Sequence, residues 1–313
     1  MQLLIPFASA LPDAAGEVLR DLALPTLQRL LRRLRALAPD AGDEYSLSPP
    51  HERALARAWG WPLVDGGLPF AARAAAADGV AVGDQAWGLL TPAHWDVGRD
   101  HVSLAAPLAL ALGEAESRAL FDALRPLFES EGFALVWGAP MRWYAAHASL
   151  AEQRCASLDR VIGRNVDLWL RGEHQGGAAA RLLRRLQSEV HLLLYPHPLN
   201  EAREARGDMT VNSFWLSGCG RHRPADEAAV HIDDSLRHPM LMQDWTAWAD
   251  AWRALDAGPL AQLLDTLEQG RDAALTLCGE RRSQRFEHQP QSVLRRFQRR
   301  WNAPLPHTVL EPL

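Results

Sequence analysis

The 313-residue sequence contains no lysine, so all 33 of its basic residues are arginine. A chain without lysine cannot form a lysine Schiff base, a lysine-containing phosphate loop or a lysine general base. A GC-rich codon usage, which favours alanine, arginine, glycine and tryptophan, accounts for this composition without a functional reason. The absence of lysine therefore excludes these three kinds of chemistry, but it does not indicate which function the protein has.

Cysteine is scarce, and long apolar runs are missing. The three cysteines, Cys155, Cys219 and Cys278, are odd in number and widely spaced, so we expect no disulfide framework and a reducing environment. No apolar run approaches the ~20 residues that cross a bilayer, and the first residues lack the basic stretch of a secretory signal. We therefore expect a cytoplasmic protein without a membrane partner. The formal net charge of -5 also disfavours a protein that coats nucleic acid.

The chain has enough apolar sequence for a large core. A hydrophobic content of 48% over 313 residues allows one sizeable domain or two intimate ones, and the sequence shows no sharp boundary. Strand patterns alternate with helix patterns, which predicts a single α/β domain over 1–313 with a mostly parallel sheet and helices on both faces. We expect a mobile connection near 172–180 and a basic helix at 290–301. The clearest predicted elements are strands at 3–5, 133–137, 211–216, 228–232 and 273–277 and helices at 114–129, 181–195, 243–255 and 260–268.

The segment 197–220 combines candidate chemistry with a backbone requirement. An asparagine and two arginines lie three residues apart, so on a helix they share one face and could present an amide and two guanidinium groups to an anion. A strand at 211–216 then leads into two glycines, where the backbone could approach a ligand closely. We expect at least one of them to have a positive φ or to lie where a Cβ would strike neighbouring backbone. The predicted anion-binding residues are His197, Asn200, Arg203, Arg206, Asn212, Gly218 and Gly220.

The order of residues in this segment resembles a known family. A His-Pro-x-Asn-x-x-Arg stretch, then Asn, then a strand ending in Gly-x-Gly is similar to the middle of the archaeal-type, cofactor-independent phosphoglycerate mutases of the alkaline-phosphatase-like superfamily. The wider chain resembles a bacterial branch of that family named for the regulation of pathogenicity factors, the RpfE type. The stretches that carry this second resemblance are TPAHWDVGRDHVSL (91–104), CASLDRVIGRNVDLWL (155–170) and LQSEVHLLLYPHPLNEAR (186–203).

The resemblance implies an alkaline-phosphatase-like fold, whose active members hold two divalent metals with Asp and His residues beside a Ser or Thr nucleophile. Here the first strand ends in PFAS (6–9) in place of Asp-Gly, and the late segment LTLCGERRSQRFE (275–287) lacks the Asp and His series. We therefore expect a degenerate member without metal or other cofactor, acting as a regulatory or ligand-binding protein for a small anion or phosphorylated metabolite. The alternative is an active mutase or phosphohydrolase in which Ser9 or Ser217 is the nucleophile.

Two further clusters leave their own alternatives open. A polar stripe at 187, 191 and 195 shares one helix face and could line the anion site or form a buried polar network. Four potential ligands could converge on a metal, although a surface hairpin with its own hydrogen bonds would show the same pattern. These four residues are His94, Asp96, Asp100 and His101.

The region from 280 to 301 carries seven arginines with aromatic residues between them. Such a region could hold a phosphate backbone and stack bases, which makes a nucleic-acid-associated protein the second functional alternative. A solvated basic helix would have the same composition. The arginines are Arg281, Arg282, Arg285, Arg295, Arg296, Arg299 and Arg300.

Overall fold

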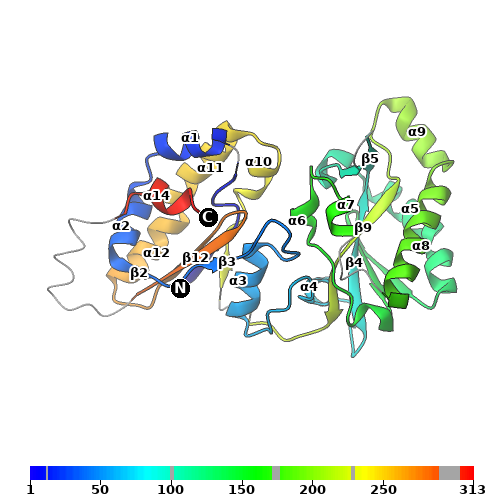
Figure 1. Cartoon of the computed structure of the whole chain (residues 1–313), viewed down its shortest axis with the longest axis horizontal. Helices are drawn as coiled ribbons and strands as arrows, with labels where there is room; N and C mark the ends of the chain where they lie inside the picture. The colour runs from blue at the N-terminus through cyan, green and yellow to red at the C-terminus, as the bar shows by residue number, and fades with distance from the viewer. Residues whose placement is uncertain (12, 99–101, 171–176, 227–229, 289–303) are drawn as a thin grey trace. The chain divides into compact units, whose positions relative to one another are not determined.

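The computed structural model describes residues 1–11, 13–98, 102–170, 177–226, 230–288 and 304–313 (Figure 1). The chain forms two compact units. Unit 1 comprises Met1–Glu44, Pro49–Trp61 and Ala225–Leu313, and unit 2 comprises Tyr45–Ser48 and Pro62–Pro224. The helix predicted at 290–301 and most of the connection predicted near 172–180 lie outside the described residues.

Unit 1 contains a mixed sheet with the strand order β10-β1-β11-β12-β2, in which β3 also pairs with β12. β1 runs parallel to β10 and β11, whereas β12 runs antiparallel to β11, β2 and β3. The backbone N–H of Gly279 donates to the carbonyl of Arg282 at 2.9 Å, and this tight turn makes the two strands that it joins antiparallel. The strands are β1 (Gln2–Ile5), β2 (Leu34–Ala36), β3 (Asp40–Ala41), β10 (His231–Ile232), β11 (Ala274–Cys278) and β12 (Arg282–His288).

Alternation along the strands of unit 1 divides their side chains between two faces. Leu3, Ile5, Leu275 and Leu277 enter the buried core that they share with most of the helices of this unit. On the opposite face, α3 (Pro50–Ala58) packs against β1, β11 and β12, so helices cover both faces of this sheet as predicted. The helices on the core face are α1 (Asp13–Asp21), α2 (Pro25–Arg33), α10 (Arg237–Leu241), α11 (Trp245–Ala257), α12 (Pro259–Glu268) and α14 (Pro306–Leu310).

Tryptophans of α11 anchor the core of unit 1. Trp248 and Trp252 are fully buried, and Trp248 meets Trp245 and Trp252 edge to face with ring centroids 5.9 and 6.3 Å apart. The indole N–H of Trp248 donates to the carbonyl of Phe7 at 3.1 Å. These tryptophans are therefore structural, and Trp248 ties α11 to the residues that follow β1.

Unit 2 contains an antiparallel sheet with the order β7-β8-β4-β9. One face packs against α5 (Glu114–Ser130) and α8 (Gly177–Leu194), and the other face packs against α4 (Phe70–Ala77). The strands are β4 (Ala86–Ala93), β7 (Ala134–Ala139), β8 (Arg142–Ala146) and β9 (Ser213–Arg221), with a separate pair β5 (Trp95–Val97) and β6 (Val102–Leu104). The remaining elements are η1 (Pro107–Leu110), η2 (Ala148–Leu150), α6 (Leu158–Val161), α7 (Asp167–Leu170) and α9 (Pro198–Arg206).

The prediction of a mostly parallel sheet is wrong, because only the pairings of β1 with β10 and β11 are parallel among the described strands. Two hairpins that the sequence did not reveal account for part of the difference, and β4 also pairs antiparallel with β8 and β9. β8 follows β7 directly, and β12 follows β11 directly, and neighbouring strands joined by short turns pair antiparallel. No helix in the described part of the chain is long and apolar enough to cross a membrane.

Candidate functional site

The predicted helix of the segment 197–220 is present as α9, but its inward side chains bind the protein itself. Asn200 is 3% exposed, and its amide nitrogen donates to the carbonyls of Leu194 at 2.9 Å and Val211 at 2.8 Å. Its amide oxygen accepts from the backbone N–H of Val211 at 3.0 Å. The Asn200 side chain therefore ties the end of α8 and the segment just before β9 to α9, and it has no donor left for a ligand.

The two arginines of α9 both reach Glu116 of α5. Arg203 is 1% exposed, and its guanidinium donates to the carbonyls of Met209 and Leu110 as well as to the Glu116 carboxylate. Arg206 is exposed and bonds to Glu116 at 2.7 Å and to Asp208 at 3.0 Å. These bonds raise the pKa of Arg206, through Asp208 first and Glu116 second.

The two other polar residues of the prediction also have structural partners. The imidazole of His197 accepts from the backbone N–H of Leu199 at 3.2 Å and caps α9. The Asn212 side chain accepts from the backbone N–H of Trp95 at 2.8 Å and donates to its carbonyl at 2.9 Å. His197 and Asn212 therefore fix the ends of α9 and of β5.

Gly218 and Gly220 have the backbone conformations that the sequence predicts, with φ of +64° and +144°. A Cβ on Gly218 would lie 2.7 Å from the backbone nitrogen of Ala71, so α4 approaches this strand too closely for a side chain. Both glycines lie inside β9 rather than in a turn after the strand. At about 3.3 Å per residue, Gly218 lies roughly 23 Å along the strand from Val211, beside which Asn200 lies. The structure therefore does not bring the two halves of the predicted anion site together.

The other predicted clusters form no site among the described residues. No group of three or more His, Cys, Asp or Glu side chains that could hold a metal occurs in the described part of the chain. A ring nitrogen of His94 lies 2.8 Å from the carbonyl of Thr210, whereas Asp100, His101 and the arginines beyond position 288 lie outside the described residues. In the polar stripe, Tyr195 is 80% exposed and His191 contacts the carbonyl of Asn212 at 3.2 Å.

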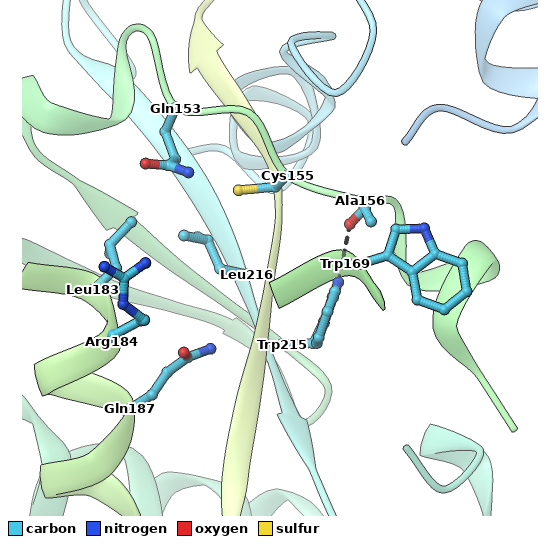
Figure 2. A pocket seen from close by; sticks show the side chains of 9 residues that line it. All are labelled: Gln153, Cys155, Ala156, Trp169, Leu183, Arg184, Gln187, Trp215 and Leu216. Atoms are coloured by element: carbon cyan, nitrogen blue, oxygen red, sulfur yellow. Dashed lines mark hydrogen bonds between the residues drawn. The ribbon is translucent and has the colours of Figure 1, made fainter. Parts of the chain in front are cut away.

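A small cavity lies in unit 2 beside β9 (Figure 2). In Figure 2 the side chains of Gln153, Arg184 and Gln187 lie to one side of it and the indoles of Trp169 and Trp215 to the other. Its volume is about 30 Å³, which is roughly the space of one water molecule and far below the ~300 Å³ of the smallest metabolite sites. This cavity can admit a very small molecule but not a phosphorylated metabolite.

A larger cavity lies in unit 1, and we call it the strand-end cavity. It follows the carboxyl ends of β1 and β11, where α/β sheets commonly bind ligands, and its volume is about 460 Å³. Its lining comes from residues 9–11 after β1, one side of α1 along its length, the turn between β11 and β12, and residues 311–313. The charged residues in its lining are Asp13, Arg20, Glu280, Arg281, Arg282 and Glu311.

Most of these charges already have partners. Arg20 pairs with Glu311 at 3.1 Å, Arg281 pairs with Glu44 at 3.4 Å, and Glu280 accepts from the backbone N–H of Leu11 at 3.1 Å. Among the described residues, the guanidinium of Arg282 has no hydrogen-bond or ion-pair partner. The strand-end cavity therefore contains one cation that is available to an anionic ligand.

The sequence did not predict this cavity: the segment 275–287 showed only missing metal ligands, and its three arginines pointed to a possible nucleic-acid surface. A usable signal was present, since a buried strand runs into Gly279 and then into two adjacent arginines. A Cβ on Gly279 would lie 2.5 Å from the carbonyl carbon of Leu313, so this turn needs glycine for close backbone packing. Here, unlike in the segment 197–220, the turn lies beside a cavity of metabolite size.

Comparison with known proteins gives only a loose likeness. No model of a protein family matches the sequence, and no curated protein is similar to it at a significant level. One similar solved structure is the cofactor-independent phosphoglycerate mutase from Thermoplasma acidophilum DSM 1728, with 12% identity, a TM-score of 0.35, and 91% of this chain and 89% of that chain covered. A second is the PH0037 protein from Pyrococcus horikoshii, with 12% identity, a TM-score of 0.46, and 92% and 87% covered. The likeness concerns the path of the chain alone.

Proposed function

We propose that this protein binds a small metabolite with an anionic group, such as a phosphate, in the strand-end cavity, and that it acts through this binding as a regulatory protein. The observation that carries the proposal is the position of Arg282, whose guanidinium is available in a cavity of about 460 Å³ at the carboxyl ends of two parallel strands. A guanidinium can form a bidentate, charge-assisted pair with a phosphate or carboxylate. The RpfE-type resemblance agrees with a regulatory role.

The residues of the described chain do not fit the two metals that the phosphoglycerate mutase resemblance implies. An in-line transfer of the kind in that superfamily needs several Asp and His ligands close together, and the described residues contain no such group. We therefore derive no catalytic step through a metal, and we expect no interconversion of 2- and 3-phosphoglycerate.

A second candidate is a phosphohydrolase that uses Ser9, because this serine lines the strand-end cavity. A serine nucleophile needs a base within hydrogen-bonding distance. Ser9 is 2% exposed, and among the described residues its hydroxyl has no hydrogen-bonded base. Hydrolysis of p-nitrophenyl phosphate that disappears in Ser9→Ala and persists in Ser235→Ala, at an exposed serine of unit 1 outside the cavity lining, would place this candidate first.

The binding proposal is tested by titration calorimetry with 3-phosphoglycerate and inorganic phosphate. Arg282→Ala should weaken binding about tenfold or more, since a hydrogen bond to a charged group contributes about 1.5–3 kcal/mol. The matched control is Arg253→Ala, which removes an arginine of unit 1 that is 59% exposed and outside the cavity lining. Equal affinities of the two variants, or no binding of either probe by the unmodified protein, would overturn the proposal.

A further inference from the structure

Two cysteines that are 64 positions apart in the sequence meet in unit 2. The Sγ atoms of Cys155 and Cys219 are 3.6 Å apart, and both thiols are free. Cys155 is 8% exposed and Cys219 is 1% exposed. The remaining cysteine, Cys278, is fully buried in β11 of unit 1 and provides an internal control.

An irregularity in β9 places Cys219 beside Cys155. Trp87 pairs with Gly220 and Leu89 pairs with Ser217, so Gly88 alone opposes the two residues Gly218 and Cys219. This bulge, with its positive φ at Gly218, shifts the alternation of the strand and turns the Cys219 side chain into the core beside α5 and α8. A Cβ on Gly88 would lie 3.2 Å from the Cys219 sulfur, so this glycine makes room for the thiol.

Neighbouring hydrogen bonds fix the position of Cys155. Its backbone N–H donates to the carbonyl of Gly66 at 3.0 Å, and the indole N–H of Trp215 donates to the carbonyl of Ala156 at 2.9 Å. Residues 153–157 have no regular secondary structure, so this segment can shift more readily than a strand of the sheet. The geometry of the pair thus combines one sulfur on a rigid strand with one on an irregular segment.

The small cavity of unit 2 gives access to one sulfur and not to the other. Cys155 belongs to its lining, whereas Cys219 does not. In Figure 2 the Cys155 sulfur points into the space between Gln153 and Leu216. A volume of about 30 Å³ suits a molecule of the size of water or hydrogen peroxide and excludes large oxidants.

We propose that Cys155 and Cys219 form a thiol–disulfide site that is oxidised by a small hydroperoxide. The Cys155 sulfur attacks one peroxide oxygen and the O–O bond breaks. The other oxygen leaves as water (or an alcohol) with the Cys155 thiol proton, and Cys155 becomes a sulfenic acid. The Cys219 sulfur then attacks the sulfenic sulfur, the S–O bond breaks, and the hydroxyl leaves as water with the Cys219 proton. Two thiols are oxidised to one disulfide and the peroxide is reduced, so atoms and electrons balance.

The environment of Cys219 agrees with its role as the sulfur that attacks the sulfenic acid of Cys155. Its hydrogen bond with Cys155 and its burial raise the pKa of the Cys219 thiol, so it keeps its proton until the sulfenic acid forms beside it. The two sulfurs must approach from 3.6 Å to about 2.05 Å to form the bond. The bond would then tie the irregular segment before α6 to β9. Transient disulfides of this kind occur in reducing compartments.

The test uses the full chain and requires no substitution at first. The folded protein is treated with graded hydrogen peroxide, free thiols are alkylated, and non-reduced peptides are analysed by mass spectrometry. We expect a Cys155–Cys219 linked peptide that is lighter than the two separate peptides by two hydrogen atoms and is cleaved by dithiothreitol, while Cys278 stays reduced. Oxidation of Cys278 at the same rate as Cys155, or sulfinic acid at Cys155 without a linked peptide, would overturn the proposal.

Two variants then separate the roles of the two sulfurs. Cys219→Ser should leave Cys155 as a sulfenic acid that dimedone traps, and Cys155→Ser should leave Cys219 reduced at the same peroxide concentration. Cys278→Ser is the control, and it should form the linked peptide in the same yield as the unmodified protein. Dimedone labelling of Cys219 in the Cys155→Ser variant would contradict the assignment of Cys155 as the first sulfur to react.

Discussion

The guanidinium of Arg203 and the carboxylate of Glu116 form an ion pair that joins α9 to α5, with the arginine side chain 2% exposed and the glutamate side chain 26% exposed. The same arginine also donates to two backbone carbonyls, so its buried charge is surrounded by acceptors. A residue that the sequence assigns to a ligand therefore stabilises the fold.

Removal of this arginine should destabilise the protein without affecting anion binding. Arg203→Ala leaves the carbonyls of Leu110 and Met209 without this donor and leaves Glu116 with Arg206 alone, and we expect a loss of about 2–3 kcal/mol in the free energy of unfolding. Arg206→Ala is the matched control, because Arg206 pairs with the same glutamate from an exposed position, and its effect should be clearly smaller. Urea unfolding measures both. Weaker phosphate binding by Arg203→Ala at unchanged stability would restore the original assignment.

The glycine in the bulge of β9 should be far more sensitive than a glycine at a helix end. Gly218→Ala combines a positive φ with a Cβ only 2.7 Å from the Ala71 nitrogen, and we expect a loss of more than about 2 kcal/mol. Gly207→Ala has a similar φ of +78° but no atom within 4 Å of the added Cβ, so only the backbone cost of about 1 kcal/mol remains. The difference between their unfolding midpoints isolates the clash with α4. Equal losses would mean that α4 moves away freely.

Asp78 should contribute stability that disappears in acid. A hydrogen bond from Arg142 lowers the pKa of Asp78 below its ordinary 3.8, and burial raises that pKa in the opposite direction. A hydrogen bond from the Tyr144 hydroxyl at 2.7 Å lowers the pKa further, so the net shift is downward. A lowered folded-state pKa gives stability that is present above the unfolded value and is lost as the pH falls through the folded value. Asp78→Asn should therefore be less stable than the unmodified protein at pH 7, and the gap should narrow below about pH 4. Asp122→Asn, in an exposed pair, is the control. A gap that is constant from pH 7 to pH 3 would argue against this linkage.

A carboxylate that is distant in sequence should prove essential to the start of α2. Asp256 is 5% exposed and accepts the backbone N–H groups of Thr26 at 3.0 Å and Leu27 at 2.8 Å. Asp256→Ala leaves both donors without an acceptor, and we expect a loss of about 2 kcal/mol. Asp250→Ala, whose side chain is 68% exposed on the same helix, should change stability by less than about 0.5 kcal/mol. Thermal unfolding compares the two, and similar midpoints would show that water replaces the cap.

The helices of the core were predictable from the sequence. The apolar spacing predicts helices at 114–129 and 243–255, and the structure has them at Glu114–Ser130 and Trp245–Ala257. These helices bury one continuous stripe of large side chains, so their period is visible without knowledge of any partner. The sequence also predicts a special backbone conformation for at least one of Gly218 and Gly220, because this requirement depends only on the neighbouring residues, and both have a positive φ.

The strands that make the sheets antiparallel were not predictable in this way. β12 contributes Phe286 to the core, and its other residues include two arginines, a glutamine and a glutamate. Its place in the sheet depends on pairing with β11 and not on its own pattern. Likewise, the sequence of the helix that carries Asn200 and Arg203 predicts an amphipathic helix with an exposed polar face. In the structure Arg203 pairs with Glu116, which lies 87 positions earlier in the sequence.

The composition of unit 1 from three separate chain segments has a consequence during synthesis. β1 leaves the ribosome before the other strands of its sheet, and its partners β10 and β11 are more than 220 residues further along the chain. At about 5–20 residues per second, the apolar strand around Leu4 waits roughly ten seconds or more for them. All of unit 2 is synthesised in that interval, since it ends at Pro224. The order of translation therefore gives the inserted unit the first opportunity to fold, and a nascent-chain binding factor would find its target at the amino-terminal strand.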